Sequence, residues 1–142
     1  MKRISIVTTL LLFILSGHLS SQTADQSTED FNPDLKYAQV HNVDMRENSD
    51  GSWRIAVTVR HADTGWDHYA DLWQVLHDDS GEVIAERPLA HPHTNEQPFT
   101  RSLSRMEIPS GVKTIRIRAK CTQHGYEGQQ MRISLDSVGS SQ

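Results

Sequence analysis

The chain has 142 residues and a formal net charge of −4 with histidine neutral. This length corresponds to one domain, and the acidic balance argues against nucleic acid or anionic lipid as the main partner. Cys121 is the single cysteine, so no disulfide can form within the chain. Eight histidines are a large share for so short a chain, and histidine is the side chain that most often binds metal ions.

The N-terminus has the pattern of a secretory signal peptide. Lys2 and Arg3 precede the mostly apolar run Ile4–Leu15, and small and polar residues follow it. The run is too short to be a good membrane span. We expect cleavage after Ser21, with a cut after Ala24 as the alternative, and a periplasmic or secreted protein without a membrane span. Cleavage after Ser21 removes two basic residues and no acidic one, which makes the net charge −6.

Short strands dominate the remaining chain. Residues 22–33 are polar and read as a flexible leader, and residues 139–142 as a tail. Between them, WRIAVTVR and IRIRAKC alternate apolar and polar residues with the period of a half-buried strand. The pattern predicts seven strands, near residues 35–46, 52–61, 70–77, 82–90, 98–106, 112–121 and 130–137. An all-β sandwich of the immunoglobulin or fibronectin type III kind is therefore predicted for residues 34–138.

The connections between these strands are of two kinds. The first, third and fifth contain the turn sequences NSDG (48–51), DDSG (78–81) and PSG (109–111). The second, fourth and sixth are ADTGWDHY (62–69), HPHTNEQ (91–97) and TQHGYEGQ (122–129). Successive connections of antiparallel strands alternate between the two ends of a sandwich, so the histidine-bearing connections should share one end.

This end is predicted to bind a metal ion. The expected ligands are His68, His91, His93 and His124. His91 and His93 are two residues apart, so in an extended segment both rings project to the same side. Neutral imidazole nitrogens suit copper and zinc.

Two further ligand candidates are His61 and Glu96. His61 also shares the phase of apolar residues in its strand, and a hydrogen-bonded histidine at the edge of the core is the favoured reading for it. Glu96 could instead accept a hydrogen bond from a ligand histidine.

Other residues are expected to surround the metal or wall the site: Asp67, Trp66, Tyr69, Tyr126 and Arg101. The three aromatic side chains could instead plug the open end of the sandwich, and this reading is favoured. Arg101 has an inward phase in its strand, so it needs an acidic partner such as Asp63 or Asp67. A β-bulge that reverses the phase is the alternative.

Cys121, His124 and Met131 form the pattern C-x2-H-x6-M. This pattern resembles the cupredoxins, the blue copper proteins. The resemblance implies a cupredoxin-like β-sandwich as the alternative fold, and a copper site with a thiolate, two histidines and a weak axial methionine. The spacing from His124 to Met131 is longer than in that family, and Cys121 and Met131 both share the phase of core residues. A buried core thiol is therefore favoured, with the ligand role as the alternative.

Three blocks carry a second resemblance: HADTGWDHYADLWQV (61–75), HPHTNEQPFTRSL (91–103) and HGYEG (124–128). They are similar to segments of small exported bacterial proteins of unassigned function. The resemblance implies a secreted β-domain with histidine-rich loops, and it implies no activity.

These observations predict an exported metal-binding protein, with copper favoured over zinc. It would act as a carrier, a buffer or an electron-transfer protein with an exported protein partner. The alternative is an immunoglobulin-like interaction module that binds a protein or carbohydrate through the same loops without metal. An enzyme is disfavoured, because no nucleophile–base motif is recognisable.

Overall fold

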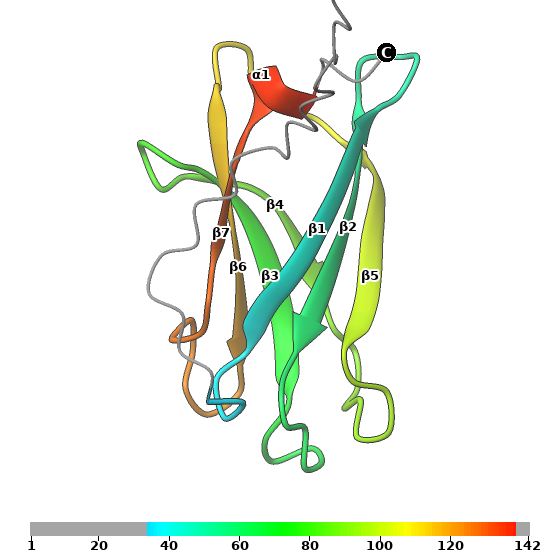
Figure 1. Ribbon diagram of the computed structural model, residues 1–142, viewed down its shortest axis with the longest axis vertical. Coiled ribbons are helices and arrows are strands. Elements are labelled where there is room, and N and C mark those ends of the chain that lie inside the picture. The colour runs from blue at the N-terminus through cyan, green and yellow to red at the C-terminus, as the bar shows by residue number, and fades with distance from the viewer. Residues whose placement is uncertain (1–33, 139–142) are drawn as a thin grey trace, which may run out of the picture.

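The computed structural model describes residues 34–138 (Figure 1). The predicted signal peptide, leader and tail, residues 1–33 and 139–142, lie outside the described residues. The described elements, in chain order, are β1 (Gln39–Glu47), β2 (Trp53–Arg60), β3 (Ala70–His77), β4 (Val83–Pro88), β5 (Phe99–Met106), β6 (Thr114–Cys121), β7 (Met131–Ser134) and the helical turn α1 (Leu135–Val138). Among residues 34–138, no helix is long and apolar enough to cross a membrane.

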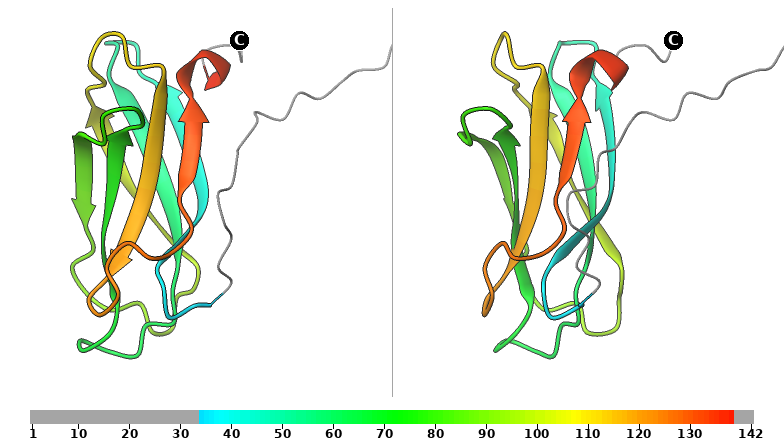
Figure 2. Two further views of the ribbon diagram at one scale, coloured as in Figure 1. Left: turned by 90° about the vertical axis from the view of Figure 1, so that its left-hand side faces the viewer. Right: turned by 60° about the vertical axis from the view of Figure 1, so that its left-hand side comes forward.

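The strands form two antiparallel sheets that pack face to face (Figure 2). One sheet has the order β1-β2-β5 and the other the order β4-β3-β6-β7. The predicted all-β sandwich is therefore confirmed. β4 pairs with β3, whereas in constant-type immunoglobulin domains the fourth strand joins the sheet that contains the first two.

The core lies between the sheets and follows the predicted period of two. In β6 every second side chain is buried, and these are Ile115, Ile117, Ala119 and Cys121. Trp73 of β3 is fully buried against them, and Met131 of β7 belongs to the same core. Cys121 is the last residue of β6, so its thiol lies where the apolar core ends and the loops begin.

Two strand ends differ from prediction. The first strand was expected to begin near residue 35, but residues 34–37 form a turn. The carboxylate of Asp34 accepts a hydrogen bond from the Lys36 amide at 3.0 Å, and its carbonyl accepts one from the Tyr37 amide at 3.1 Å. Aspartate favours such turns because its side chain can bind the backbone two residues on. The last strand ends at Ser134, and α1 follows it.

The connections divide between the two ends as predicted (Figure 1). The three short turns lie at one end and contain Gly51, Gly81 and Gly111, whose φ angles of 82°, 72° and 88° favour glycine. The three longer connections, 61–69, 89–98 and 122–130, lie at the other end together with the turn at 34–37. We call these four segments the histidine end.

Candidate metal centre

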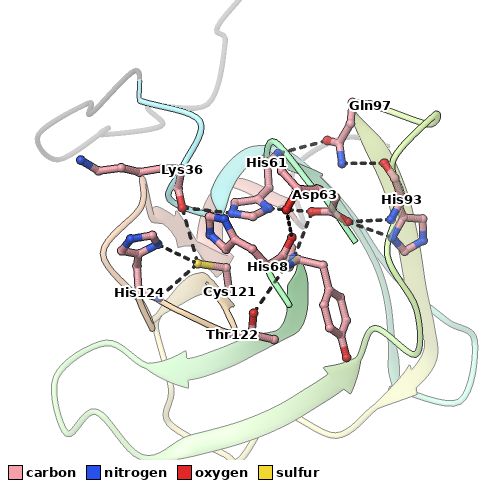
Figure 3. Close-up of polar contacts among 12 residues, drawn as sticks. Lys36, His61, Asp63, His68, His93, Gln97, Cys121, Thr122 and His124 are labelled. Atoms are coloured by element: carbon pink, nitrogen blue, oxygen red, sulfur yellow. Dashed lines mark hydrogen bonds and ion pairs between the residues drawn. The ribbon is translucent and has the colours of Figure 1, made fainter. Parts of the chain in front are cut away.

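Three donor groups meet at the histidine end (Figure 3). One ring nitrogen each of His61 and His68 and the Sγ atom of Cys121 lie within 4.8 Å of one another. His61 follows β2, His68 precedes β3, and Cys121 ends β6. The pairing of β3 with β6 brings Cys121 beside the loop that carries both histidines, and the Thr122 amide donates to the Tyr69 carbonyl at 3.0 Å.

His61 is buried, and both of its ring nitrogens face oxygen acceptors. Nδ1 lies 2.6 Å from Asp63 Oδ1, and Nε2 lies 3.0 Å from the carbonyl oxygen of Lys36. A neutral imidazole has only one N–H. If that N–H donates to Asp63, the Nε2 lone pair faces a carbonyl oxygen, and a cation near both atoms relieves the conflict. The alternative is a ring with an N–H on each nitrogen, paired with the carboxylate.

The Cys121 thiol is surrounded by polar groups on its outer side. Its sulfur lies 3.5 Å from the Lys36 carbonyl oxygen and 3.5 Å from His124 Nδ1. It also accepts a hydrogen bond from the His124 amide at 3.4 Å. Gly125, with a φ of 60°, closes a tight turn back to Cys121 and so holds His124 against the sulfur. Hydrogen bonds to a cysteine sulfur tune the potential of a copper ion bound to it.

His68 has a buried nitrogen, Nε2, that finds no hydrogen-bond partner among residues 34–138. Its ring packs edge-on against His61 and His124, at centroid distances of 4.7 and 5.0 Å. Burial lowers the pKa of His68, and positive charge on His61 or His124 lowers it further. The ring therefore tends to stay neutral, which is the form that binds metal. A metal ion bound at this nitrogen would give it the partner that the described residues do not supply.

Asp63 links the connection that carries His61 to the connection that carries His93 (Figure 3). Its side chain is fully buried. Oδ1 faces His61 and accepts the Ala70 amide at 3.1 Å, while Oδ2 accepts the His93 amide at 2.6 Å. Burial alone would raise the pKa of Asp63, but the hydrogen bonds from His61, His93 and Ala70 outweigh it and lower the pKa. The carboxylate is thus a fixed negative charge beside His61, an arrangement typical of metal-binding histidines.

His93 lies on the other side of Asp63 (Figure 3), and neither His91 nor His93 belongs to the group formed by His61, His68 and Cys121. The His93 ring is buried, stacks on Phe99 at 3.7 Å, and has its Nε2 2.8 Å from an Arg101 nitrogen. A guanidinium at this distance occupies the lone pair that a metal ion would need. His91 is exposed and packs against His93 at 4.5 Å. The metal-binding role predicted for the pair stays a prediction.

Arg101 has an acidic partner, but that partner is Glu96 rather than Asp63 or Asp67. Its guanidinium forms an ion pair with Glu96 at 3.2 Å. The Asp63 carboxylate is already engaged by His61 and two amides, and Asp67 is exposed. Asp67 contributes its carbonyl oxygen, which accepts from the Thr122 hydroxyl at 3.1 Å and tethers neighbouring loops. Glu96 lies at the rim of the end rather than among the clustered donors.

The aromatic residues occupy different environments. Trp66 is 67% exposed and meets Tyr69 edge-on at 5.7 Å, so the expectation that it plugs the sandwich is wrong. It lies at the tip of a loop whose buried positions are taken by His61 and Asp63. Tyr126 packs under the Arg118 guanidinium at 3.9 Å, and burial raises its pKa. The Tyr37 ring meets the His124 ring edge-on at a centroid distance of 5.3 Å.

His93 makes the stability of the fold dependent on pH. Burial lowers its pKa from the ordinary 6.5, and Arg101 and His91 lower it further. The unfolded chain therefore takes up a proton near pH 6.5 that the folded chain resists, so stability is lost as the pH falls below about 6.5. Between pH 7 and pH 5, we expect this group to lower the unfolding free energy of metal-free protein by up to ~1.4 kcal/mol per pH unit. Urea unfolding of wild-type protein and of His93→Gln at several pH values measures this effect. An equal dependence of the unfolding free energy on pH in the two proteins would contradict it.

Comparisons with known proteins give one relative. The "Putative lipoprotein" of Halomicrobium mukohataei is 35% identical over 130 residues, which cover 92% of this chain and 63% of the relative. This chain thus spans less than two thirds of that protein's length. No family model matches the chain, and no solved structure matches it significantly.

Proposed function

We propose that this protein is exported and binds a copper ion through His61, His68 and Cys121, as a carrier, a buffer or an electron-transfer protein. The observation that carries the proposal is the approach of two imidazoles and a thiol to within 4.8 Å at the edge of the core. Burial of these polar groups costs free energy that apolar side chains would avoid, and the cost is offset if the groups bind an ion. The name of the relative, a lipoprotein, supports a location outside the cytoplasm.

The donor set favours copper over zinc. Two histidines and one cysteine with a weak axial ligand are typical of blue copper sites, and a backbone carbonyl can be that axial ligand. The Lys36 carbonyl oxygen lies 3.0 Å from His61 Nε2 and 3.5 Å from the Cys121 sulfur. Donors on one ion are about 3–4 Å apart when metal–ligand bonds are ~2.0–2.3 Å, so the described groups need only a small contraction. Zinc would instead require a fourth strong ligand, which His124 could supply.

A metal titration tests the proposal. Metal-free protein titrated with copper should bind one equivalent with a Kd below about 1 μM, and more tightly than zinc. His68→Ala should weaken copper binding by more than about 100-fold, because it removes a ligand. His91→Ala is the matched control: His91 is an exposed histidine of the same end that lies outside the proposed donor set, so its loss should leave the affinity of that site unchanged. Binding of copper no tighter than micromolar, or an equal loss in His91→Ala, would overturn the proposed site.

One observation favours the alternative of a metal-independent interaction module. Trp66 exposes most of its ring beside Tyr69, and aromatic side chains are frequent anchors of protein and carbohydrate contacts. Trp66→Ala should abolish partner capture if this is the function, and it should leave copper affinity intact in either case. The two functions are thereby separated by variants of the same loop.

A further inference from the structure

A second site lies beside the candidate metal centre, between the end of β4 and the start of β5. It is a pocket of about 100 Å³ lined by Arg87, His91, His93, Arg101 and the segment 88–90. None of the metal donors His61, His68 and Cys121 lines it. Two arginines and two histidines around a small opening make a site rich in N–H donors.

Arg87 has N–H donors that the described part of the chain leaves unused. Its buried Nε atom has no hydrogen-bond partner there, and its Nη1 atom donates to the Pro88 carbonyl at 3.4 Å. No carboxylate among residues 34–138 forms an ion pair with it. A partly buried guanidinium without a counter-charge is unfavourable, and a bound anion would remove the cost.

Arg101 is held in position at the other side of the pocket. One of its nitrogens donates to the Thr100 carbonyl at 2.8 Å, and another lies 2.8 Å from His93 Nε2. Its acidic partner, Glu96, has 56% of its side chain exposed, so this carboxylate is a rim group in contact with water. The lining and rim groups therefore carry two fixed positive charges and one solvated negative charge.

We propose that this pocket binds a small oxyanion of the phosphate class between Arg87 and Arg101. Guanidinium groups present paired N–H donors that match the oxygens of such ions, and they keep their charge at every accessible pH. The volume suits an ion of a few heavy atoms, since a cavity of about 150 Å³ accommodates benzene. The proposal does not depend on the metal site, because it uses none of the metal donors.

Calorimetric titration of metal-free protein with inorganic phosphate at low ionic strength tests this site. We expect one equivalent to bind, and Arg87→Gln to weaken the affinity by about 10-fold or more through loss of a charge-assisted contact. Arg46→Gln is the control, since Arg46 is an exposed arginine of β1 that does not line the pocket. Equal weakening by both variants would show a general charge effect and overturn the proposal, as would the absence of saturable binding below about 10 mM.

A second variant tests the site with both arginines in place. Glu96→Gln removes the competing carboxylate at the rim, so phosphate should bind more tightly, by about 3-fold or more. Unchanged or weaker binding in this variant would contradict the assignment. Sulfate should compete with phosphate for the pocket, whereas acetate should compete much less. A pocket that prefers acetate is a carboxylate site, and that result would overturn the assignment of the ligand to the phosphate class.

Discussion

Replacing Asp63 with asparagine is expected to lower the free energy of unfolding by about 3 kcal/mol or more. The carboxylate is fully buried and faces donors from three partners: the His61 ring and the amides of Ala70 and His93. An asparagine side chain has only one acceptor oxygen, so its NH₂ group must face an N–H donor. The substitution also removes the negative charge beside His61, and both effects act in a site closed to water.

Urea unfolding of metal-free protein at pH 8 measures this change, with Asp67→Asn as the control. Asp67 lies in the same loop and is exposed, and its backbone carbonyl accepts hydrogen bonds from the Thr122 and Gln123 side chains. Its substitution should change stability by less than about 0.5 kcal/mol. A loss of less than 1 kcal/mol in Asp63→Asn, on the order of an ordinary exposed substitution, would show that the three hydrogen bonds do not organise this end.

Copper(II) bound by the Cys121 thiolate is expected to give a visible thiolate-to-copper charge-transfer band. Replacing Cys121 with serine should remove this band and weaken copper binding by more than about 100-fold. The thiolate is the soft donor of the proposed site, and a hydroxyl does not replace it as a ligand for copper. The fold should survive, because the two side chains are close in size and the Lys36 carbonyl can accept a hydrogen bond from the new hydroxyl. A stability loss of about 1–2 kcal/mol is expected from burying that hydroxyl.

Visible absorption spectra with copper(II) provide the measurement, and Met131→Leu provides the control. Met131 lies in the apolar core, so its substitution should leave the band in place. A band that persists in Cys121→Ser would place copper at another site. A shifted band in Met131→Leu, with the fold intact, would instead support the weak axial methionine that the cupredoxin resemblance implies.

The end of the sandwich that gathers the histidines could be predicted from the sequence, but the grouping within that end could not. Strand period and turn composition determined which connections share an end, and this placed His68 and His124 correctly near each other. The phase of β6 also showed that Cys121 points inward, but a phase does not distinguish the middle of a core from its boundary. Cys121 is the last inward residue of its strand, where the core gives way to polar loops.

The HPH segment, residues 91–93, was by itself a weak signal for a metal site and did not identify the clustered donors. Two imidazoles at alternate positions predict a common direction, but the neighbours in that direction come from other strands. Here those neighbours are Phe99, which stacks on the His93 ring, and Arg101, whose guanidinium lies within hydrogen-bond distance of His93 Nε2. The Lys36 carbonyl escaped prediction for a different reason, since a backbone oxygen has no residue type to mark it. The turn-forming Asp34 was the available signal.

The carboxylate of Asp63 couples the conformations of two connections, 61–69 and 89–98. One oxygen orients His61, and the other fixes the backbone of His93, so neither loop can reposition without disturbing the partner of the other. Any ligand that orders one loop therefore changes the free energy of ordering the second. Thermodynamic reciprocity then requires that copper and oxyanion, if both bind, alter each other's affinity by the same factor.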